Sequence, residues 1–410
     1  MTDWRWGLRA RDMLEALAGA SAPGPGVTRL PFTPEHDAAL ALLRGWMEAA
    51  GLLVRLDAAG TLSGRAEGPE GAPVLLMGSH QDSVPGGGAF DGIMGVVLPI
   101  LALEKLREEG RALPVAVEVL AFADEEGVRF PTALLGSRAL AGTADPAVLE
   151  MADRQGVTLG GALAAFGGDP GGVAALARDP SVVAGFVETH IEQGPVLEQA
   201  GEPLGIVTAI CGIERHAVTL TGRTGHAGTV PMAARRDALA GAAALVTEVR
   251  RMGLDTPGLR ATVGELHVVP NAVNAIPGEV RLTVELRAPS DELREAAGTA
   301  LHLAAAQIAR EAELDLVIGR SYVQPAVPCD PALSARLEAA ARAAGAGVPS
   351  LPSGATHDAS AMAGLCPVAM LFLRCRDGAS HVPEEHADPA DMGVAVAALA
   401  GLVAGFGAEA

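Results

Sequence analysis

Cysteine and aromatic residues are both scarce in this chain of 410 residues. Its four cysteines have no CxxC spacing and are too few to stabilise a chain of this length by disulfide bonds; they are Cys211, Cys329, Cys366 and Cys375. We therefore expect a cytoplasmic protein with reduced thiols. Because Phe, Trp and Tyr make up only 3% of the residues, the core must consist mainly of Ala, Val and Leu.

Positive charge and long apolar runs are also lacking. The chain has 30 Lys and Arg against 49 Asp and Glu, which gives a formal net charge of -19. Nucleic acids and anionic membranes attract positively charged surfaces, so we predict neither as a partner. No apolar run approaches the roughly 20 residues that span a bilayer. Charged side chains interrupt the N-terminal segment, which therefore does not resemble a signal peptide.

Histidine and carboxylate residues, by contrast, stand directly after apolar segments. The run 74–77 predicts a short buried strand that carries His80 and Asp82 at its carboxyl end. A glycine-rich turn then returns the chain to Asp91. A neutral imidazole, an acidic residue that can orient it and a second carboxylate suit a divalent cation such as Zn or Mn. The alternative is a polar turn with an incidental histidine.

A second apolar strand, predicted over 115–123, is followed by Asp124, Glu125 and Glu126. Adjacent carboxylates repel one another unless a cation or a shared proton offsets their charge. Neighbouring side chains diverge, so one of Glu125 and Glu126 can bind a metal while the other faces the substrate and holds a proton. A solvated acidic turn is the alternative.

Two more apolar segments end in the same kinds of residue. The strand predicted over 182–187 is followed by His190, and the strand predicted over 367–374 is followed by His381. Ligands collect at the carboxyl ends of parallel strands. Four strands that each bring a histidine or a carboxylate to one edge of a sheet make coincidence improbable.

The sequence pattern changes between these strands. Segments 215–221, 261–268 and 280–287 alternate between apolar and polar residues, as half-exposed antiparallel strands do. Segments 237–250 and 291–312 are typical of amphipathic helices.

We therefore predict two domains. Residues 1–211 and 323–410 are expected to form an α/β catalytic domain with a mixed sheet and helices on both faces. Residues 212–322 are expected to form an inserted, smaller α+β domain, because the strands that carry candidate ligands resume after it.

Taken together, these motifs resemble the M20 metallopeptidase superfamily from about Thr33 to His386. The matching stretches are GSHQDSVPGGGAFDG, FADEEGVRFPTALLGSRALAG, HIEQGPVLE, TGRTGHAGTVPMAARRDAL, PNAVNAIPGEVRLTVELRA, SGATHDASAMA and LFLRCRDGASHVPEEH. Within this superfamily, the segment HIEQGP resembles the motif of the amidase branch. That branch includes allantoate amidohydrolases, N-carbamoyl-L-amino acid hydrolases and β-ureidopropionases. The resemblance implies a ferredoxin-like fold and a lid or dimerisation role for the inserted domain.

The resemblance also implies two divalent metal ions per subunit, either Mn or Zn, or else Co or Ni. Glu125 would be the general base on a bridging water, and Asp82 would orient a histidine ligand. The ligands implied are Asp91 as the bridge, His80 and His190 on one ion, and Glu126 and His381 on the other.

Contacts with the substrate follow from the same resemblance. His226 would stabilise the oxyanion, either across a homodimer or on closure of the lid. Asn274 and Arg287 match substrate-binding positions of the family. The guanidinium of an arginine such as Arg287 can donate two parallel hydrogen bonds to a carboxylate. Gln193 would hydrogen-bond to the ureido group, and Arg215 is a weaker candidate. Without the resemblance, His226 could be a lone histidine in a polar loop and Arg287 a surface charge.

Three residues depart from the family pattern, namely Thr356, Cys211 and Ala89. They leave every implied ligand in place but affect the expected pocket wall and hinge, so they bear on the substrate more than on the chemistry. His357 is expected to lie behind the metal ligands. The remaining histidines are expected to be structural or at the surface: His36, His216, His267, His302 and His386.

The combined prediction is a homodimeric, cytoplasmic amidohydrolase that cleaves a terminal ureido C–N bond in a carboxylate-bearing small molecule. Allantoate is the first choice of substrate, because DEEGVRF and LGSR resemble the allantoate-type members. An N-carbamoyl-L-amino acid is the second. An M20 peptidase or aminoacylase is a weaker alternative, and a non-catalytic binding protein would require a lost base or ligand. A serine hydrolase is not expected, because the sequence contains no Gly-x-Ser-x-Gly motif.

Overall fold

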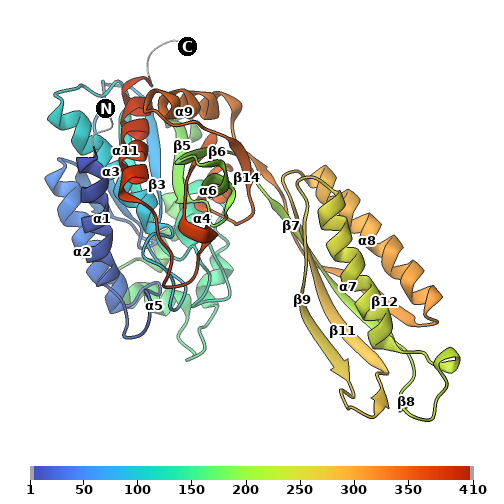
Figure 1. The fold of residues 1–410 in the computed structure, drawn as a ribbon. Helices are drawn as coiled ribbons and strands as arrows, with labels where there is room; N and C mark the ends of the chain where they lie inside the picture. The colour runs from blue at the N-terminus through green and yellow to red at the C-terminus, as the bar shows by residue number, and fades with distance from the viewer. Residues whose placement is uncertain (1–3, 407–410) are drawn as a thin grey trace. The chain divides into compact units, whose positions relative to one another are not determined.

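The protein is described by a computed structural model that covers residues 4–406, so both ends of the predicted catalytic domain, 1–3 and 407–410, lie outside the described residues. The chain divides into two compact units. Figure 1 shows the fold, coloured by residue number from blue to red. Among the described residues, unit 1 comprises 4–208, 329–351 and 357–406. Unit 2 comprises Ala209–Pro328 and Pro352–Thr356.

Unit 1 is built on a mixed sheet, as the sequence predicts. Its strands lie in the order β1, β2, β4, β3, β5, β15 and β6. The pairs β4–β3, β3–β5 and β5–β15 are parallel, whereas β1, β2 and β6 pair antiparallel. The strands are β1 (Leu53–Leu56), β2 (Leu62–Ala66), β3 (Val74–His80), β4 (Ala116–Phe122), β5 (Val183–Ile191), β6 (Leu204–Ile210), β14 (Ser350–Ser353), which pairs with β6, and β15 (Val368–Leu373).

The strand predicted over 182–187 was too short. The structure continues β5 to Ile191, because its main chain stays paired with β15 as far as Leu373. The polar side chain of Glu188 is tolerated inside the strand because both of its carboxylate oxygens have partners, the hydroxyl of Ser79 at 2.6 Å and the backbone N–H of Ala359 at 2.8 Å.

Helices cover both faces of the sheet in unit 1. One face packs against α2, α3, α9 and α11, and Val187 of β5 belongs to this core, whereas α1 packs on α3 and α11. The neighbouring Glu188 points to the opposite face, where it contacts α10. The helices are α1 (Arg5–Ala18), α2 (Pro34–Ala49), α3 (Ile93–Glu108), α4 (Leu135–Ala141), α5 (Leu159–Phe166), α6 (Val196–Ala200), α9 (Pro331–Ala343), α10 (Asp358–Met362) and α11 (Pro389–Ala404).

Unit 2 contains a four-stranded antiparallel sheet in the order β12, β7, β11 and β9. Alternate residues of β11 are buried, as predicted, and they pack against α7 and α8 in a separate core. The elements are β7 (Gly212–Thr221), β8 (Gly225–His226), α7 (Ala238–Asp255), β9 (Arg260–Val269), β10 (Ala275–Ile276), β11 (Glu279–Ala288), α8 (Asp291–Glu311), β12 (Asp315–Gln324) and β13 (Val327–Pro328).

The segment Pro352–Thr356 groups with unit 2, although the sequence analysis assigned it to the catalytic domain. The backbone N–H of Cys211 donates to the carbonyl of Ser353 at 2.9 Å, and Arg287 donates to the carbonyl of Gly354 at 2.6 Å. These contacts involve residues far apart in the sequence, so no local pattern predicts them.

Within residues 4–406, no helix combines the length and the apolar character that crossing a membrane requires.

Candidate metal centre

Four neighbouring parallel strands of unit 1 carry the candidate metal ligands. The strands β4, β3, β5 and β15 lie side by side in the sheet. His80 is the last residue of β3, and His190 lies one residue before the end of β5. Glu125 and Glu126 follow β4, and His381 follows β15. Because the carboxyl ends of parallel strands meet at one edge of a sheet, the topology gathers these side chains.

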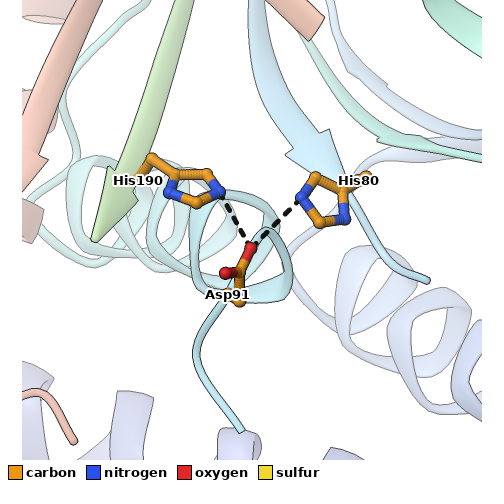
Figure 2. Close-up of side chains that lie close together, drawn as sticks. All are labelled: His80, Asp91 and His190. Atoms are coloured by element: carbon orange, nitrogen blue, oxygen red, sulfur yellow. Dashed lines mark ion pairs between the residues drawn. The ribbon is translucent and has the colours of Figure 1, made fainter. Parts of the chain in front are cut away.

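His80, Asp91 and His190 form a buried group, shown in Figure 2. Oδ1 of Asp91 lies 3.4 Å from Nε2 of His80 and 3.1 Å from Nε2 of His190. The Nδ1 atoms face carbonyl oxygens instead, those of Asp82 at 2.9 Å and Ile191 at 3.0 Å. A neutral imidazole that donates from Nδ1 has its lone pair on Nε2. Both lone pairs would then face one carboxylate oxygen, an arrangement that suits a cation between them.

Gly92 allows this close approach. It has a φ of 63°, and a Cβ at this position would lie 2.3 Å from the ring of His80. Its backbone N–H donates to Nε2 of His190 at 3.2 Å, which agrees with a lone pair on that nitrogen. A larger residue would force Asp91 away from the two histidines.

A second group shares Asp91 and consists of Asp91, Glu126 and His381. Nε2 of His381 lies 3.5 Å from Oδ2 of Asp91 and 3.8 Å from Oε1 of Glu126. Oε1 of Glu126 is buried and has no hydrogen-bond partner among the described residues. A buried carboxylate oxygen without a donor is costly unless a cation neutralises it. The donor set of imidazole and carboxylate therefore fits a divalent metal ion.

Glu125 lies beside the first group rather than within it. Its Oε2 is 3.8 Å from Nε2 of His80, and the residue is only 7% exposed. The backbone N–H groups of Glu125 and Glu126 donate to the two carboxylate oxygens of Asp82 at 3.2 and 3.3 Å. The carboxylate of Asp82 therefore holds the Glu125 loop, while its carbonyl, not its carboxylate, orients His80. This second finding differs from the predicted contact.

The electrostatics of the centre favour bound positive charge. Burial raises the pKa of Glu125 well above its usual value, against the opposing effect of His80. Burial also raises the pKa of Glu126 to about 7. Burial alone would lower the pKa of His80, but the carboxylates around it, Glu125 first, raise it well above normal. Buried groups of this kind retain protons unless a cation takes their place.

Gln193 contacts the shared carboxylate. Its Nε2 donates to Oδ2 of Asp91 at 2.8 Å and to the hydroxyl of Ser380 at 2.9 Å. Gln193 adopts a φ of 55°, which is uncommon for a residue with a side chain. The contact places Gln193 at the centre, where the sequence analysis expects a substrate contact.

Several buried residues around the centre were missed by the sequence analysis. Oε1 of Glu385 accepts from the backbone N–H of Asp91 at 2.9 Å. Glu188 links β3 and β5 to α10, and Asp358 is fully buried nearby, where burial raises its pKa well above normal. Their one local signal is proximity in the sequence, since Glu385 follows His381 by four residues.

His357 lies behind His190, as expected. The two ring centroids are 4.5 Å apart with a T-shaped arrangement. Burial, followed by the charge of His190, lowers the pKa of His357 well below its ordinary value. His357 is therefore neutral and shields one side of His190 from solvent.

The candidate substrate contacts of unit 2 lie on exposed backbone. His226 in β8 is exposed and pairs with Ala275 of β10. The backbone N–H of Ala227 donates to the carbonyl of Asn274 at 2.9 Å. The short β8–β10 ribbon therefore brings His226 and Asn274 into one small region.

Arg287 lies on the face of β11 that the helices of unit 2 leave open. Its Nε donates to Oε1 of Glu285 at 2.7 Å, in addition to the contact with Gly354. Arg215 binds the other oxygen of Glu285 and stacks on the ring of Tyr322. Both candidate arginines are thus held by one carboxylate.

The departures from the family pattern make ordinary contacts. Thr356 accepts a hydrogen bond from Gln324 at 3.2 Å, Cys211 is buried and Ala89 packs against the core of unit 1. The five histidines expected to be structural or at the surface are not among the residues of the two metal-ligand groups; they are His36, His216, His267, His302 and His386.

Comparisons with known proteins identify the family of the chain. The sequence pattern of peptidase family M20/M25/M40 matches residues 76–405. The chain belongs to this family. The chain is 41% identical over 378 residues, 92% of each chain, to an N-carbamoyl-L-amino acid amidohydrolase of Geobacillus stearothermophilus. It is also 41% identical to an allantoate deiminase of Arabidopsis thaliana, over 94% of this chain and 80% of that protein.

Solved structures place the M20 chain in the amidase branch. A hydantoinase/carbamoylase family amidase from Burkholderia multivorans superimposes with a TM-score of 0.91 at 35% identity and covers 98% of both chains. The fold class, the family and the assignment as a hydrolase of C–N bonds are therefore as the sequence predicts.

Proposed function

We propose that the protein is a two-metal amidohydrolase that removes a terminal ureido group from a carboxylate-bearing small molecule. The observation that carries this proposal is the pair of ligand groups that share Asp91. His80 and His190 would hold one ion, and Glu126 and His381 the other. Bound divalent cations would lower the pKa of a water and polarise the carbonyl that is attacked.

Glu125 is the proposed general base. Its carboxylate lies beside the ligand groups without belonging to either of them. From this buried position it would accept a proton from the attacking water and deliver it to the leaving nitrogen. The carboxylate of Asp82 accepts the backbone N–H groups of Glu125 and Glu126 and so fixes the position of this loop.

The proposed substrate contacts use complementary chemistry. Arg287 would bind the carboxylate of the substrate through two donors, and Asn274 would add a hydrogen bond. His226 would donate to the carbonyl oxygen as negative charge develops on it. Gln193 would bind the ureido nitrogen or oxygen, because its amide group offers both a donor and an acceptor.

Allantoate is the proposed first substrate, supported by the DEEGVRF and LGSR segments. An N-carbamoyl-L-amino acid is the second candidate, supported by the equal identity of the two relatives described above. Both substrates combine a carboxylate with a terminal ureido group, so the same residues would serve either. The choice of metal among Mn, Zn, Co and Ni, the homodimer, the lid role of unit 2 and the cytoplasmic location remain predictions.

Ammonia release tests the proposal. The metal-reconstituted protein is incubated with allantoate, a panel of N-carbamoyl-L-amino acids, and N-acetyl amino acids and dipeptides, each with and without a chelator. We expect chelator-sensitive ammonia release from allantoate. Ammonia release from N-carbamoyl-L-amino acids alone would show that these, not allantoate, are the substrates, and the proposed mechanism would stand. Acetyl amino acids and dipeptides yield no ammonia, so their cleavage is measured by the free amino acids released. Cleavage of these compounds alone would favour the aminoacylase or peptidase alternative.

A further inference from the structure

Glu385 holds the backbone of the shared ligand Asp91. The residue is only 4% exposed, and it comes from the loop that follows β15. Its Oε1 accepts the backbone N–H of Phe90 at 2.8 Å and that of Asp91 at 2.9 Å. Both hydrogen bonds end on the same side-chain oxygen. The carboxylate thus fixes the main chain at Asp91.

The same loop is tied to Asp91 on the other side of His381. The hydroxyl of Ser380 donates to Oδ2 of Asp91 at 2.9 Å. His381 itself adopts a φ of 60° and its side chain is 49% exposed, so neither its backbone preference nor burial holds it in place. Ser380 and Glu385 therefore connect the His381 loop to Asp91 from both flanks.

Gly88 leaves room for this contact. A Cβ on Gly88 would lie 2.3 Å from Cβ, Cδ and Oε1 of Glu385. The backbone at position 88 packs directly on the carboxylate, so any larger residue would displace it.

The second ligand group depends on this connection more than the first. The histidines of the first group stand on β3 and β5, which the sheet holds rigidly. In the second group, by contrast, Asp91, Glu126 and His381 all lie in loops. Burial of the Glu385 carboxylate is expensive, because its Oε2 has no hydrogen-bond partner within residues 4–406.

We propose that Glu385 is a positioning residue that holds Asp91 and His381 together and thereby sets the affinity for the second metal ion. This inference rests on the proposed two-metal function. Residues that orient metal ligands through hydrogen bonds commonly change metal affinity by about 10- to 100-fold when they are replaced.

Two conservative variants separate position from charge. Glu385→Asp keeps the charge but is one methylene shorter, so it cannot reach both N–H groups. Glu385→Gln loses the charge but keeps an oxygen that can accept both hydrogen bonds. Glu384→Gln is the matched control, because Glu384 is an exposed neighbour that undergoes the same change of charge.

The measurement is titration of the metal-free proteins with Zn²⁺ or Mn²⁺ by calorimetry, with thermal unfolding as a check on folding. We expect Glu385→Asp to lower the affinity for one of the two ions by about 10-fold or more. The affinities of Glu385→Gln and Glu384→Gln for both ions should stay within about threefold of wild type. Unchanged binding in Glu385→Asp, or equal weakening in Glu385→Gln, would overturn the positioning role. Wild-type protein that binds fewer than two ions would instead overturn the two-metal proposal.

Gly88→Ala provides an independent test, since it leaves every polar side chain intact. The added methyl group should displace the Glu385 carboxylate and weaken the binding of one ion, as expected for Glu385→Asp. Wild-type affinity for both ions in Gly88→Ala would contradict the role assigned to this contact.

Discussion

The two units present their candidate functional residues in different ways. In unit 1 the candidates stand at the ends of adjacent parallel strands, and His80, Asp91 and His190 are buried within a few ångströms of one another. In unit 2, His226 and Asn274 are exposed on a two-stranded ribbon. One unit has a site formed by its own fold, whereas the other offers separate polar side chains.

This difference follows from the topology. Parallel strands direct their carboxyl ends to one edge, so residues far apart in sequence converge without special contacts. The strands of an antiparallel sheet end at alternate edges, and the open face of the sheet in unit 2 spreads its side chains over a surface. We therefore expect unit 1 to hold the metal ions and the base, and Arg287 of unit 2 to contribute substrate affinity. The predictions below test this difference from the largest effect to the smallest.

Replacement of the base in unit 1 should have the largest effect. Glu125→Gln should reduce kcat by about 10³-fold, because proton transfer by a positioned group contributes on this scale. Metal content should remain unchanged, since Glu125 belongs to neither ligand group. Steady-state kinetics and metal analysis of the same sample would check both points. Turnover within tenfold of wild type would refute the assigned base.

A change in unit 2 should act on binding instead. Arg287→Lys should raise KM by about 10-fold or more and change kcat little, because an ammonium cannot form two parallel hydrogen bonds with a carboxylate. Arg281→Lys is the matched control, since Arg281 is on the same exposed face of β11. The division of roles would fail if Arg287→Lys lowered kcat alone, or if both variants behaved alike.

A buried histidine outside the site should affect stability alone. His36 is buried, its Nδ1 accepts the N–H of Phe32 at 2.9 Å, and burial lowers its pKa to about 3. The unfolded state therefore binds a proton below about pH 6.5 that the folded state excludes, so stability falls as the pH decreases. Asn cannot take up this proton but can accept the same hydrogen bond.

Urea unfolding of wild type and His36→Asn at pH 7.5 and pH 5 would measure this effect. The stability advantage of the wild type over the variant should shrink by roughly 2 kcal/mol at the lower pH. Activity at neutral pH should be unchanged. An advantage that is independent of pH would show that His36 is not held neutral by burial.

Much of unit 1 could be predicted from the sequence, because its signals are local. Continuous apolar runs predicted β3, β4 and β15, and the polar residues that follow them predicted the edge of the sheet at which the candidate ligands meet. The alternation in β11 likewise predicted a strand with one buried face. Periodicity and strand ends were sufficient for these elements.

The remaining features depend on contacts between distant segments. Glu188 lies inside β5 because its partners come from β3 and α10, and Glu385 is buried because Gly88 leaves space for it. Asp82 orients His80 through its carbonyl, since its carboxylate binds the backbone of the Glu125 loop. No residue pattern along the chain encodes these choices.

Metal titration of wild type and Asp91→Ala is the most direct test of the shared centre. Asp91 belongs to both ligand groups, so its removal should affect both ions rather than one. We predict that the metal-free wild type binds two ions per chain and that Asp91→Ala loses tight binding of both while remaining folded. A wild type that binds a single ion, or an Asp91→Ala variant that still binds two ions with unchanged affinity, would contradict the account.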